Sequence, residues 1–256
     1  MKLYFKEFAQ HPSLPPLVLL HGLLGSLVNW QRIARELSDQ YRVIVPDLRN
    51  HGRSPHASDV SYIGMAGDVL ELLDDLDLES AAVVGHSMGG KTAMLMALQY
   101  PQRIERLGVV DIAPVTYSGS LGLLLDALLA LPLEEIENRR DADRILAQSV
   151  PDKAVRDHML QNLRRTEDGW KWRNNLLALR QGLAHISGFP VLNEGDCYQG
   201  KTVFIKGALS DYIKPSYQPQ IEKLFPAATL VEIANAGHWV YAQQPKAFLD
   251  ALREFL

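Results

Sequence analysis

The sequence is poor in cysteine: Cys197 is the single one among 256 residues. It has no partner for an internal disulfide, which suits a reducing compartment, and we expect a cytoplasmic protein. Long apolar runs are missing as well, since no uninterrupted apolar stretch reaches the length of a membrane span. Residues 1–8 alternate polar and apolar side chains where a signal peptide would carry an apolar core. We therefore expect neither a membrane span nor a secretion signal.

A strong excess of charge of one sign is also absent. The formal net charge is -4 and no block of like charges stands out, so charge gives no reason to expect nucleic acid as a partner. His, Asp and Glu are too scattered for a metal signature such as His-Glu-x-x-His, and no Gly-x-Gly-x-x-Gly loop follows a predicted strand. We expect no metal and no cofactor, and a small-molecule substrate as the partner.

What the sequence does contain is ample material for a buried core. Hydrophobic residues make up 47% of the chain and charged residues 22%, proportions that suit a large globular fold. Short apolar runs alternate with segments of helical spacing. The predicted strands lie at residues 3–8, 17–20, 41–45, 83–84, 107–110, 202–206 and 229–233. Such alternation predicts an α/β protein with a mostly parallel, twisted sheet and helices on both faces.

The alternation is interrupted between residues 112 and 196. This stretch contains several helical patterns but no convincing buried strand. We predict that residues 112–196 form an inserted helical cap, and that residues 1–111 and 197–256 together form the core that carries the sheet.

The chemistry is expected at Gly85-His86-Ser87-Met88-Gly89, where a β-branched run meets the start of a helix. A strand that turns abruptly into a helix holds the turning residue in a strained backbone conformation, and glycines two residues before and after it leave room for the turn. The Ser87 hydroxyl would project at a helix N-terminus, where the Met88 amide lacks a helical partner and can bind an oxyanion. The pattern predicts a nucleophile elbow and therefore a hydrolase.

A serine hydroxyl is a weak nucleophile near neutral pH, so it needs a base and an acid that orients the base. We predict that the base is His238, in the segment Asn235-Ala236-Gly237-His238-Trp239 just beyond the last strand. A loop at this position lies at the same sheet edge as the elbow and could bring the histidine to Ser87.

Two aspartates at strand ends compete for the role of the acid. Asp111 terminates its strand directly, and the Ile-Ala-Pro that follows makes the backbone leave the sheet. Asp211 lies on a turn after the strand that reaches Gly207, where a carboxylate often serves as a turn or helix cap. We favour Asp111 and keep Asp211 as the alternative.

A second oxyanion donor is expected in the loop His21-Gly22-Leu23, after the apolar run 17–20. Gly22 lets the backbone approach the site closely, and we assign the donor to the amide of Leu23. We expect His21, and His51 in a later loop, to hold loop geometry rather than to transfer protons.

Lys91 lies in the first helical turn after Ser87. One interpretation is a serine–lysine mechanism. The other, which we favour, is an ordinary side chain beneath the cap.

With these residues in place, the chain resembles the α/β-hydrolase superfamily, and within it the YbfF esterases and their animal relatives, the alpha/beta hydrolase domain 11 proteins. The resemblance rests on five motifs. They are His21-Gly22-Leu23-Leu24-Gly25-Ser26, Asp47-Leu48-Arg49-Asn50-His51-Gly52-Arg53-Ser54-Pro55, Gly85-His86-Ser87-Met88-Gly89-Gly90-Lys91, Asp111-Ile112-Ala113-Pro114-Val115 and Gly237-His238-Trp239. The resemblance implies an esterase or thioesterase that acts on acyl chains, with Ser87, His238 and a strand-end aspartate as its triad.

The resemblance also bears on the choice of acid. In the common arrangement of the superfamily the acid stands three residues after a glycine such as Gly207, a position that Ser210 occupies here and that Asp211 misses by one. In the YbfF-like group the position of Asp211 is often not acidic, whereas this chain carries an aspartate there. The likeness therefore supports Asp111, with Ser210 as a hydrogen-bonding support of the acid and the base.

Substrate choice is expected to depend on the predicted cap. Residues 121–133 are rich in leucine, and residues 170–175 read Trp-Lys-Trp-Arg-Asn-Asn. We expect most of these side chains to bury one another. The pattern Trp172-Arg173-x-Asn175 also resembles the family's cap, which implies a share in pocket shape. Arg173 leaves two alternatives: it binds an anionic head group such as that of an acyl-coenzyme A, or it forms an internal salt bridge.

Together these features predict a serine carboxylesterase that cleaves short-to-medium acyl esters, or acyl-coenzyme A thioesters, through an acyl-enzyme on Ser87. Two alternatives remain: a carbon–carbon bond hydrolase or perhydrolase on the same triad, and a ligand receptor that does not hydrolyse.

Overall fold

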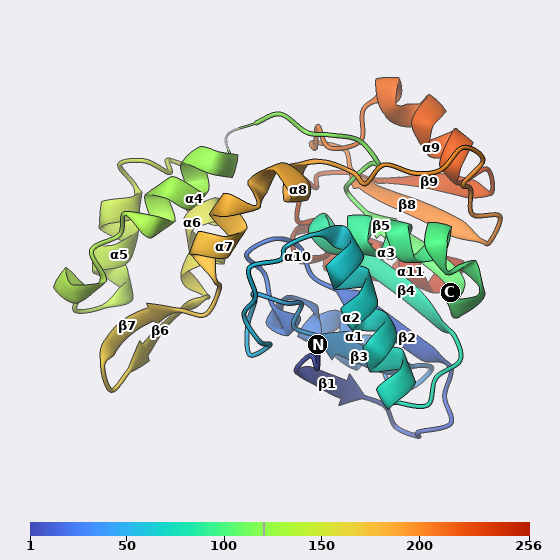
Figure 1. Cartoon of the computed structure of the whole chain (residues 1–256), viewed down its shortest axis with the longest axis horizontal. Coiled ribbons are helices and arrows are strands. Elements are labelled where there is room, and N and C mark those ends of the chain that lie inside the picture. The colour runs from blue at the N-terminus through green and yellow to red at the C-terminus, as the bar shows by residue number, and fades with distance from the viewer. Residues whose placement is uncertain (120) are drawn as a thin grey trace.

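The computed structural model describes residues 1–119 and 121–256, and a seven-stranded sheet lies at its centre (Figure 1). The strands are β1 (Phe5–Phe8), β2 (Pro16–Leu20), β3 (Arg42–Pro46), β4 (Ala81–His86), β5 (Ile104–Val110), β8 (Thr202–Gly207) and β9 (Ala228–Ile233). Their order across the sheet is β1-β3-β2-β4-β5-β8-β9. The edge strand β1 pairs antiparallel with β3, and the pairs from β3 to β9 are parallel. The predicted mostly parallel sheet is confirmed.

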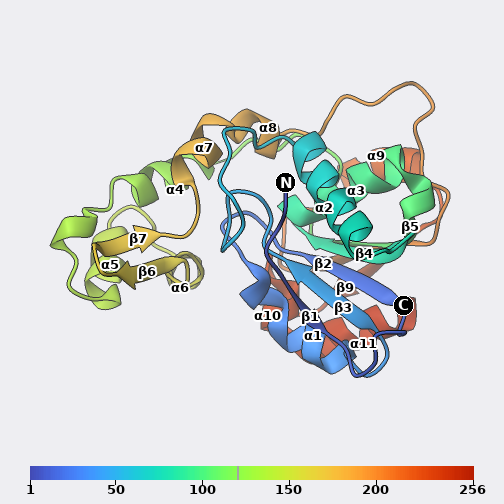
Figure 2. The ribbon, with the colours of Figure 1, turned by 60° about the horizontal axis from the view of Figure 1, so that its bottom comes forward.

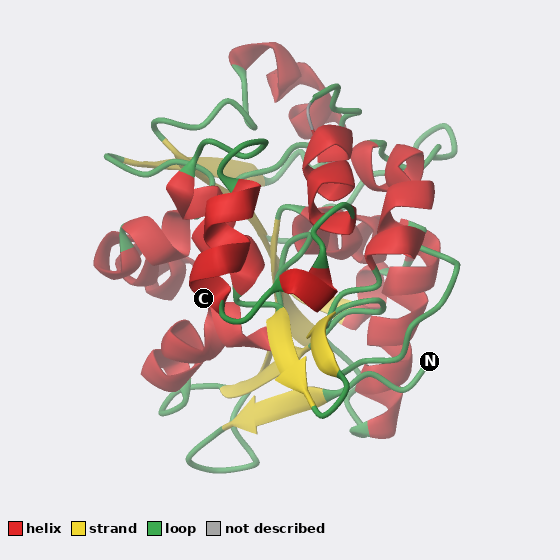
Figure 3. Cartoon of the chain, turned by 90° about the vertical axis from the view of Figure 1, so that its left-hand side faces the viewer, coloured by secondary structure: helices red, strands yellow, loops and turns green. Residues whose placement is uncertain are grey.

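Helices cover both faces of this sheet, as Figures 2 and 3 show from two directions. They are α1 (Gln31–Leu37), α2 (Tyr62–Asp75), α3 (Met88–Gln99), α9 (Gln218–Leu224), α10 (Val240–Gln243) and α11 (Pro245–Phe255). The buried side chains of α2, α3 and α9 pack in one apolar cluster and those of α1, α10 and α11 in another. Because both faces are covered, a central strand needs an uninterrupted apolar run, and all six residues of β4 are buried.

The helices and the hairpin of residues 121–181 lie beside the sheet layers rather than in them, as Figures 1 and 2 agree. The elements between residues 112 and 196 are α4 (Leu121–Leu129), α5 (Arg139–Leu146), α6 (Lys153–Leu160), β6 (Leu163–Thr166), β7 (Gly169–Trp172), α7 (Leu176–Gln181) and α8 (Leu183–Ser187). Strands β6 and β7 form an antiparallel hairpin that the sequence did not predict. The hairpin is short and carries exposed charged side chains, so its sequence contains no apolar run from which a buried strand could be predicted. We call residues 112–196 the cap segment; its exact division from the core stays a prediction.

Short 3-10 helices connect several of these elements. They lie at Leu27–Trp30, Pro101–Arg103, Leu133–Glu135 and Pro215–Tyr217. Within residues 1–119 and 121–256 no helix is both long and apolar enough to cross a membrane.

The register of the sheet brings the ends of four strands together. Leu20 of β2 is paired with Gly85 of β4, His86 of β4 with Val110 of β5, and Val110 with Ile205 of β8. Because these strands are parallel, the loops that follow them leave the sheet at one edge. The predicted site residues come after these strands, except His238, which follows β9; Ile233 of β9 is paired with Gly207 of β8.

Candidate active site

Ser87 joins β4 to α3 in a strained backbone conformation, with φ 53° and ψ -116°. The glycines around it are required by close backbone contacts. A Cβ atom on Gly85 would lie 2.1 Å from the carbonyl oxygen of Gly89, and one on Gly89 would lie 2.5 Å from the carbonyl oxygen of Leu20. The turn therefore has the geometry that the sequence predicts for a nucleophile elbow, with a half-buried serine at its apex.

Asp111 and His238 are hydrogen-bonded, although 127 residues separate them. The His238 Nδ1–H group donates to Asp111 Oδ2 over 2.8 Å, and the Gly207 amide donates to Asp111 Oδ1 over 3.1 Å. Asp111 is fully buried, so these donors replace the water that its carboxylate would otherwise bind. With Nδ1 protonated, the neutral imidazole keeps a free lone pair on Nε2. That is the tautomer a general base requires.

The loop after β8 separates Ser210 from Asp211. The Ser210 hydroxyl donates to Asp111 Oδ2 over 2.5 Å, which places Ser210 in the supporting position expected for it. Asp211 is exposed and forms no hydrogen bond or ion pair with any other described residue. The structure thus brings Asp111, and not Asp211, to the histidine.

The Ser210–Asp111 hydrogen bond predicts a moderate loss of activity on substitution. We expect Ser210→Ala to lower kcat by about tenfold, because one hydrogen bond to a carboxylate contributes roughly 1.4 kcal/mol. Asp111 keeps its other two donors in this variant. Steady-state kinetics on a p-nitrophenyl ester measure the change, with the exposed Ser216→Ala as control. Unchanged kcat in Ser210→Ala would contradict the supporting role.

Ser87 and His238 are linked through His86, the residue before the serine. The His86 Nε2–H group donates to the carbonyl oxygen of His238 over 2.9 Å, and the two imidazole centroids are 4.6 Å apart. The Ser87 hydroxyl itself has no hydrogen bond to another described residue, which is common before a substrate aligns nucleophile and base. This contact was not predicted from the sequence, although a histidine in an otherwise apolar strand is a signal for it.

Tyr212 also touches the base. Its ring stacks on the His238 imidazole with centroids 4.0 Å apart and an interplanar angle of 23°. Stacking of this kind restricts rotation of the imidazole and keeps Nδ1 aimed at Asp111. No sequence pattern marked Tyr212, because its contact depends on the path of the loop that follows Ser210.

Two backbone amides near Ser87 are free to bind an oxyanion. Neither the Leu23 amide nor the Met88 amide donates to any described residue. The loop that carries Leu23 lies against the elbow, since a Cβ atom on Gly22 would be 3.2 Å from the Cβ atom of Ser87. These amides are therefore in the region that the sequence analysis assigned to the oxyanion hole.

The loop of Leu23 is held by two buried histidines, as expected. His21 Nε2 accepts a hydrogen bond from the Leu48 amide over 2.9 Å, and His51 Nε2 accepts one from the Leu24 amide over 3.1 Å. Burial lowers the pKa of His21 to about 4 and that of His51 to about 3, so both are neutral and can accept. They fix the loop and have no free proton-transfer role.

Lys91 is turned away from this chemistry. Its ammonium donates to the carbonyl oxygens of Val115, Ser187 and Gly188. The lysine is 1% exposed and lies beneath the cap segment, which matches the favoured one of its two interpretations.

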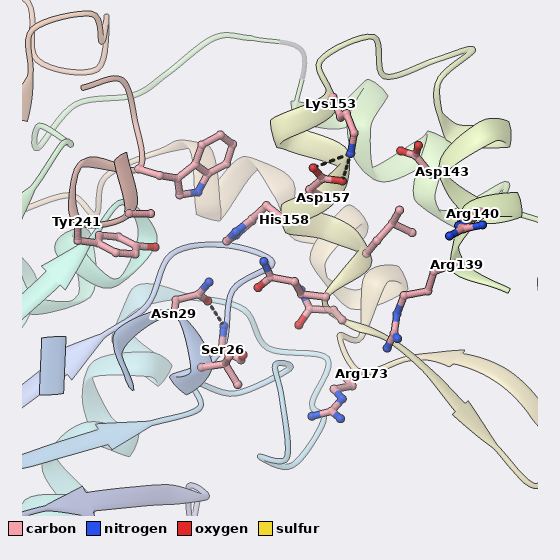
Figure 4. Close-up of a pocket in the computed structure, with 16 residues that line it drawn as sticks. Ser26, Asn29, Arg139, Arg140, Asp143, Lys153, Asp157, His158, Arg173 and Tyr241 are labelled. Carbon is pink, nitrogen blue, oxygen red and sulfur yellow. Dashed lines mark hydrogen bonds and ion pairs between the residues drawn. The ribbon is translucent and has the colours of Figure 1, made fainter. Parts of the chain in front are cut away.

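A groove of about 900 Å³ runs between the core and the cap segment (Figure 4), and Trp239, the residue after His238, is part of its lining. Figure 4 shows His158 reaching from α6 toward Asn29 and Tyr241 on the core side. The His158 ring lies 5.0 Å from that of Trp239, and burial together with nearby His238 lowers its pKa to about 4. His158 is therefore a neutral polar group in the groove at physiological pH.

The charges in the groove do not cancel. Lys153 is paired with Asp157, and the groove's other carboxylate belongs to Asp143, which is paired with Arg156. The remaining cations have no ion-pair partner among the described residues: Arg139, Arg140 and Arg173. The Nε group of Arg173 is buried without a hydrogen-bond acceptor among those residues. This leaves an excess of positive charge available to a ligand.

The other residues of the predicted cap pattern, Trp172 and Asn175, do not line the groove. Asn175 caps α7 and binds Asn50 of the core, while Trp172 packs against the apolar cluster. No group of three or more metal-ligating side chains occurs in the described part of the chain.

Comparison with known proteins identifies the family. A family model described as the alpha/beta hydrolase fold matches residues 15–245. The chain belongs to the alpha/beta hydrolase family. The expected fold class and the expected family membership are both confirmed by this match.

Several similar proteins of the alpha/beta hydrolase family carry informative names. The chain is 43% identical over 252 residues to the mouse (Mus musculus) sn-1-specific diacylglycerol lipase ABHD11, covering 95% of this chain and 81% of the relative. It is 36% identical over 242 residues to esterase YbfF of Escherichia coli, covering 94% and 92%. A solved marine microorganism esterase is 38% identical with a TM-score of 0.96, and the match covers 100% of both chains. The prediction of a hydrolytic enzyme of the esterase or lipase type is confirmed at this level.

Proposed function

We propose that this alpha/beta hydrolase is a serine carboxylesterase in which Ser87, His238 and Asp111 form the catalytic triad. The observation that carries the proposal is the buried Asp111–His238 hydrogen bond beside a serine held at a strained strand-to-helix turn. Asp111 holds Nδ1 protonated, and His238 Nε2 is left to take the proton of the Ser87 hydroxyl.

The proposed reaction has two stages. The Ser87 oxygen attacks the carbonyl carbon while His238 takes its proton, and the amides of Leu23 and Met88 bind the oxyanion. The tetrahedral species collapses, the bond to the leaving group breaks, and His238 gives the proton to the departing alcohol or thiol. Water then attacks the acyl-enzyme with the same histidine as base, which releases the acid and restores Ser87.

For substrate, we propose short-to-medium acyl esters, extending to acyl-coenzyme A thioesters. The support is the groove lined by Trp239, the residue after His238, because three of its arginines have no ion-pair partner among the described residues. Guanidinium groups bind phosphates through paired hydrogen bonds, so a leaving group that carries phosphate would meet complementary charge there. Arg173 is the half-buried member of the three, and its free Nε group favours the anion-binding alternative over a salt bridge.

The chemistry proposed here uses only these side chains and water, in line with the expectation that no cofactor is needed. The single cysteine, Cys197, is exposed with a free thiol. A free exposed thiol suits a reducing compartment, and we propose the cytoplasm as the location.

A matched set of substrates tests the proposal. We expect p-nitrophenyl esters and acyl-coenzyme A thioesters, compared from acetyl to palmitoyl, to show a sharp optimum of kcat/KM at one acyl length. Arg173→Gln should lower kcat/KM for the thioesters about tenfold, since one charge-assisted contact is lost, and change the p-nitrophenyl esters by less than about twofold.

The control for this experiment is Arg165→Gln, which removes an exposed arginine from the β6–β7 hairpin outside the groove. It should leave both substrate series unchanged. Equal losses on thioesters and p-nitrophenyl esters in Arg173→Gln would sink the anion-binding role, and no hydrolysis of either series would sink the proposed function.

A further inference from the structure

Lys91 connects the two segments that join the cap segment to the core. Val115 is on the outgoing connection after β5, and Ser187 and Gly188 are on the returning connection at the end of α8. The Lys91 ammonium donates to all three carbonyl oxygens, over 2.9 Å, 2.9 Å and 2.5 Å. A single side chain on α3 thus holds both connections at once.

Two tyrosines complete this arrangement. The ammonium lies 4.8 Å from the ring centroid of Tyr117 and 5.8 Å from that of Tyr62. The Tyr117 amide donates to the Ser187 carbonyl over 2.9 Å, and the Tyr62 hydroxyl donates to the Ile186 carbonyl over 2.6 Å. The two connections are therefore bonded to each other and to α2 as well as to α3.

The lysine has no carboxylate partner among the described residues. A buried cation without a counter-ion is costly, and an apolar side chain of similar volume would be cheaper to bury. The feature that an apolar side chain cannot supply is the set of three directed hydrogen bonds. This points to a role in geometry rather than in overall stability.

We propose that Lys91 is a positioning residue that sets the placement of the cap segment over the active site by clamping its two connections to α3. The Lys91 amide donates to the Ser87 carbonyl over 3.0 Å, so the clamp belongs to the same helical turn as the elbow. One wall of the groove, including His158 and Arg173, is on the cap segment. Figure 1 shows α5, α6 and the hairpin far from the two connections. A small rotation of the cap segment about the connections therefore produces a large displacement at the groove.

The clamp responds to pH. Burial lowers the pKa of Lys91 to about 7, while burial raises the pKa of Tyr62 and of Tyr117, whose rings face the ammonium, so both stay neutral. The returning connection binds the ammonium through the carbonyl groups of Ser187 and Gly188. A protonated amine offers three N–H groups and a neutral one only two. As the pH rises through about 7, at least one of the three bonds is therefore lost, and the connections loosen.

A distance measurement tests the clamp directly. Cys197 is exposed and is the single native cysteine, so a spin label there marks the core. Ala154→Cys adds a second label at an exposed position of α6 that does not line the groove. We expect a narrow distance distribution at low pH that broadens on the alkaline side of the pKa. In Lys91→Met it should be broad throughout and insensitive to pH.

Kinetics provide a second readout. Lys91→Met should lower kcat/KM by about tenfold or more for substrates large enough to fill the groove, and by less than about threefold for p-nitrophenyl acetate. If Lys91 only stabilised the fold, Lys91→Met would lower the melting temperature and would leave unchanged the ratio of kcat/KM for large substrates to kcat/KM for p-nitrophenyl acetate. Lys201→Met is the matched control, since it removes a core lysine that bonds the Phe255 carbonyl far from the connections.

A distance distribution in Lys91→Met as narrow as that of the wild type would overturn the proposal. If Lys91→Met does not fold, Lys91→Gln takes its place, because it keeps two N–H groups for the three carbonyl oxygens. A distribution broader than that of the wild type supports the clamp, and one as narrow as that of the wild type overturns it. The distances do not depend on hydrolysis, so this failure is distinguishable from a failure of the proposed esterase activity.

Discussion

Ser87→Ala is expected to lower kcat by about 10⁴-fold or more on every ester that the enzyme hydrolyses. The variant removes the only atom that forms the acyl-enzyme in the proposed reaction. Alanine has a Cβ atom as serine does, so the backbone at position 87 should keep its strained conformation with φ 53°. Because the hydroxyl has no hydrogen bond to a described residue, the free energy of unfolding should change by less than about 0.5 kcal/mol.

Two measurements check this expectation. Steady-state turnover gives the loss of kcat, and a fluorophosphonate probe followed by mass spectrometry shows whether Ser87 alone is labelled in the wild type. Ser80→Ala is the control, because it removes a surface serine hydroxyl that bonds Glu105 and lies at the opposite end of β4. Near-normal turnover in Ser87→Ala would refute the nucleophile. A wild type that resists the probe would favour a receptor that keeps the fold without hydrolysis.

The fold was predictable because its signal is carried along the chain. Buried parallel strands require uninterrupted apolar runs, and those at β2, β4 and β5 are plain in the sequence. The β6–β7 hairpin escaped for the opposite reason: its strands are short and mostly exposed, so no period of buried residues marks them. The spacing of apolar residues predicts a helix or strand only where the residues in question are buried.

The proximity of the candidate site residues was predictable to the extent that strand ends determine their positions. Ser87, Asp111 and His238 all follow strands that end at one sheet edge, and parallel topology places such ends side by side. The contacts of Tyr212 and His158 could not be predicted from the sequence, because they depend on how a loop and the cap segment pack in space. The partners of Lys91 are 24 to 97 residues away in the sequence, and no motif specifies them.

The two candidate acids, Asp111 and Asp211, differ in their contacts because of the direction of one loop. Ser210 and Asp211 are neighbours, yet the first points to the buried carboxylate and the second to solvent. In the sequence both aspartates follow predicted strands. Motif spacing favoured Asp111 as the acid but left Asp211 as an alternative. We therefore expect the same substitution, Asp to Asn, to lower kcat much more at position 111 than at position 211.

Asp111→Asn is expected to lower kcat by about 10³ to 10⁴-fold, and Asp211→Asn by less than about threefold. An amide in place of the Asp111 carboxylate has one oxygen for the three donors that the carboxylate accepts, namely the Gly207 amide, the Ser210 hydroxyl and the His238 ring. The imidazole then loses both the partner that keeps Nδ1 protonated and the negative charge that stabilises the imidazolium. Asp211 has no such partner among the described residues.

Because Asp111 is fully buried, its substitution must be separated from misfolding. Circular dichroism melting curves of both variants show whether the fold persists, and kcat is compared only at temperatures well below the lower transition. A folded Asp111→Asn should keep a KM close to that of the wild type, since the carboxylate acts on the histidine and not on the substrate. If instead Asp211→Asn showed the larger loss of kcat, the buried carboxylate would be a structural support and the exposed one the acid.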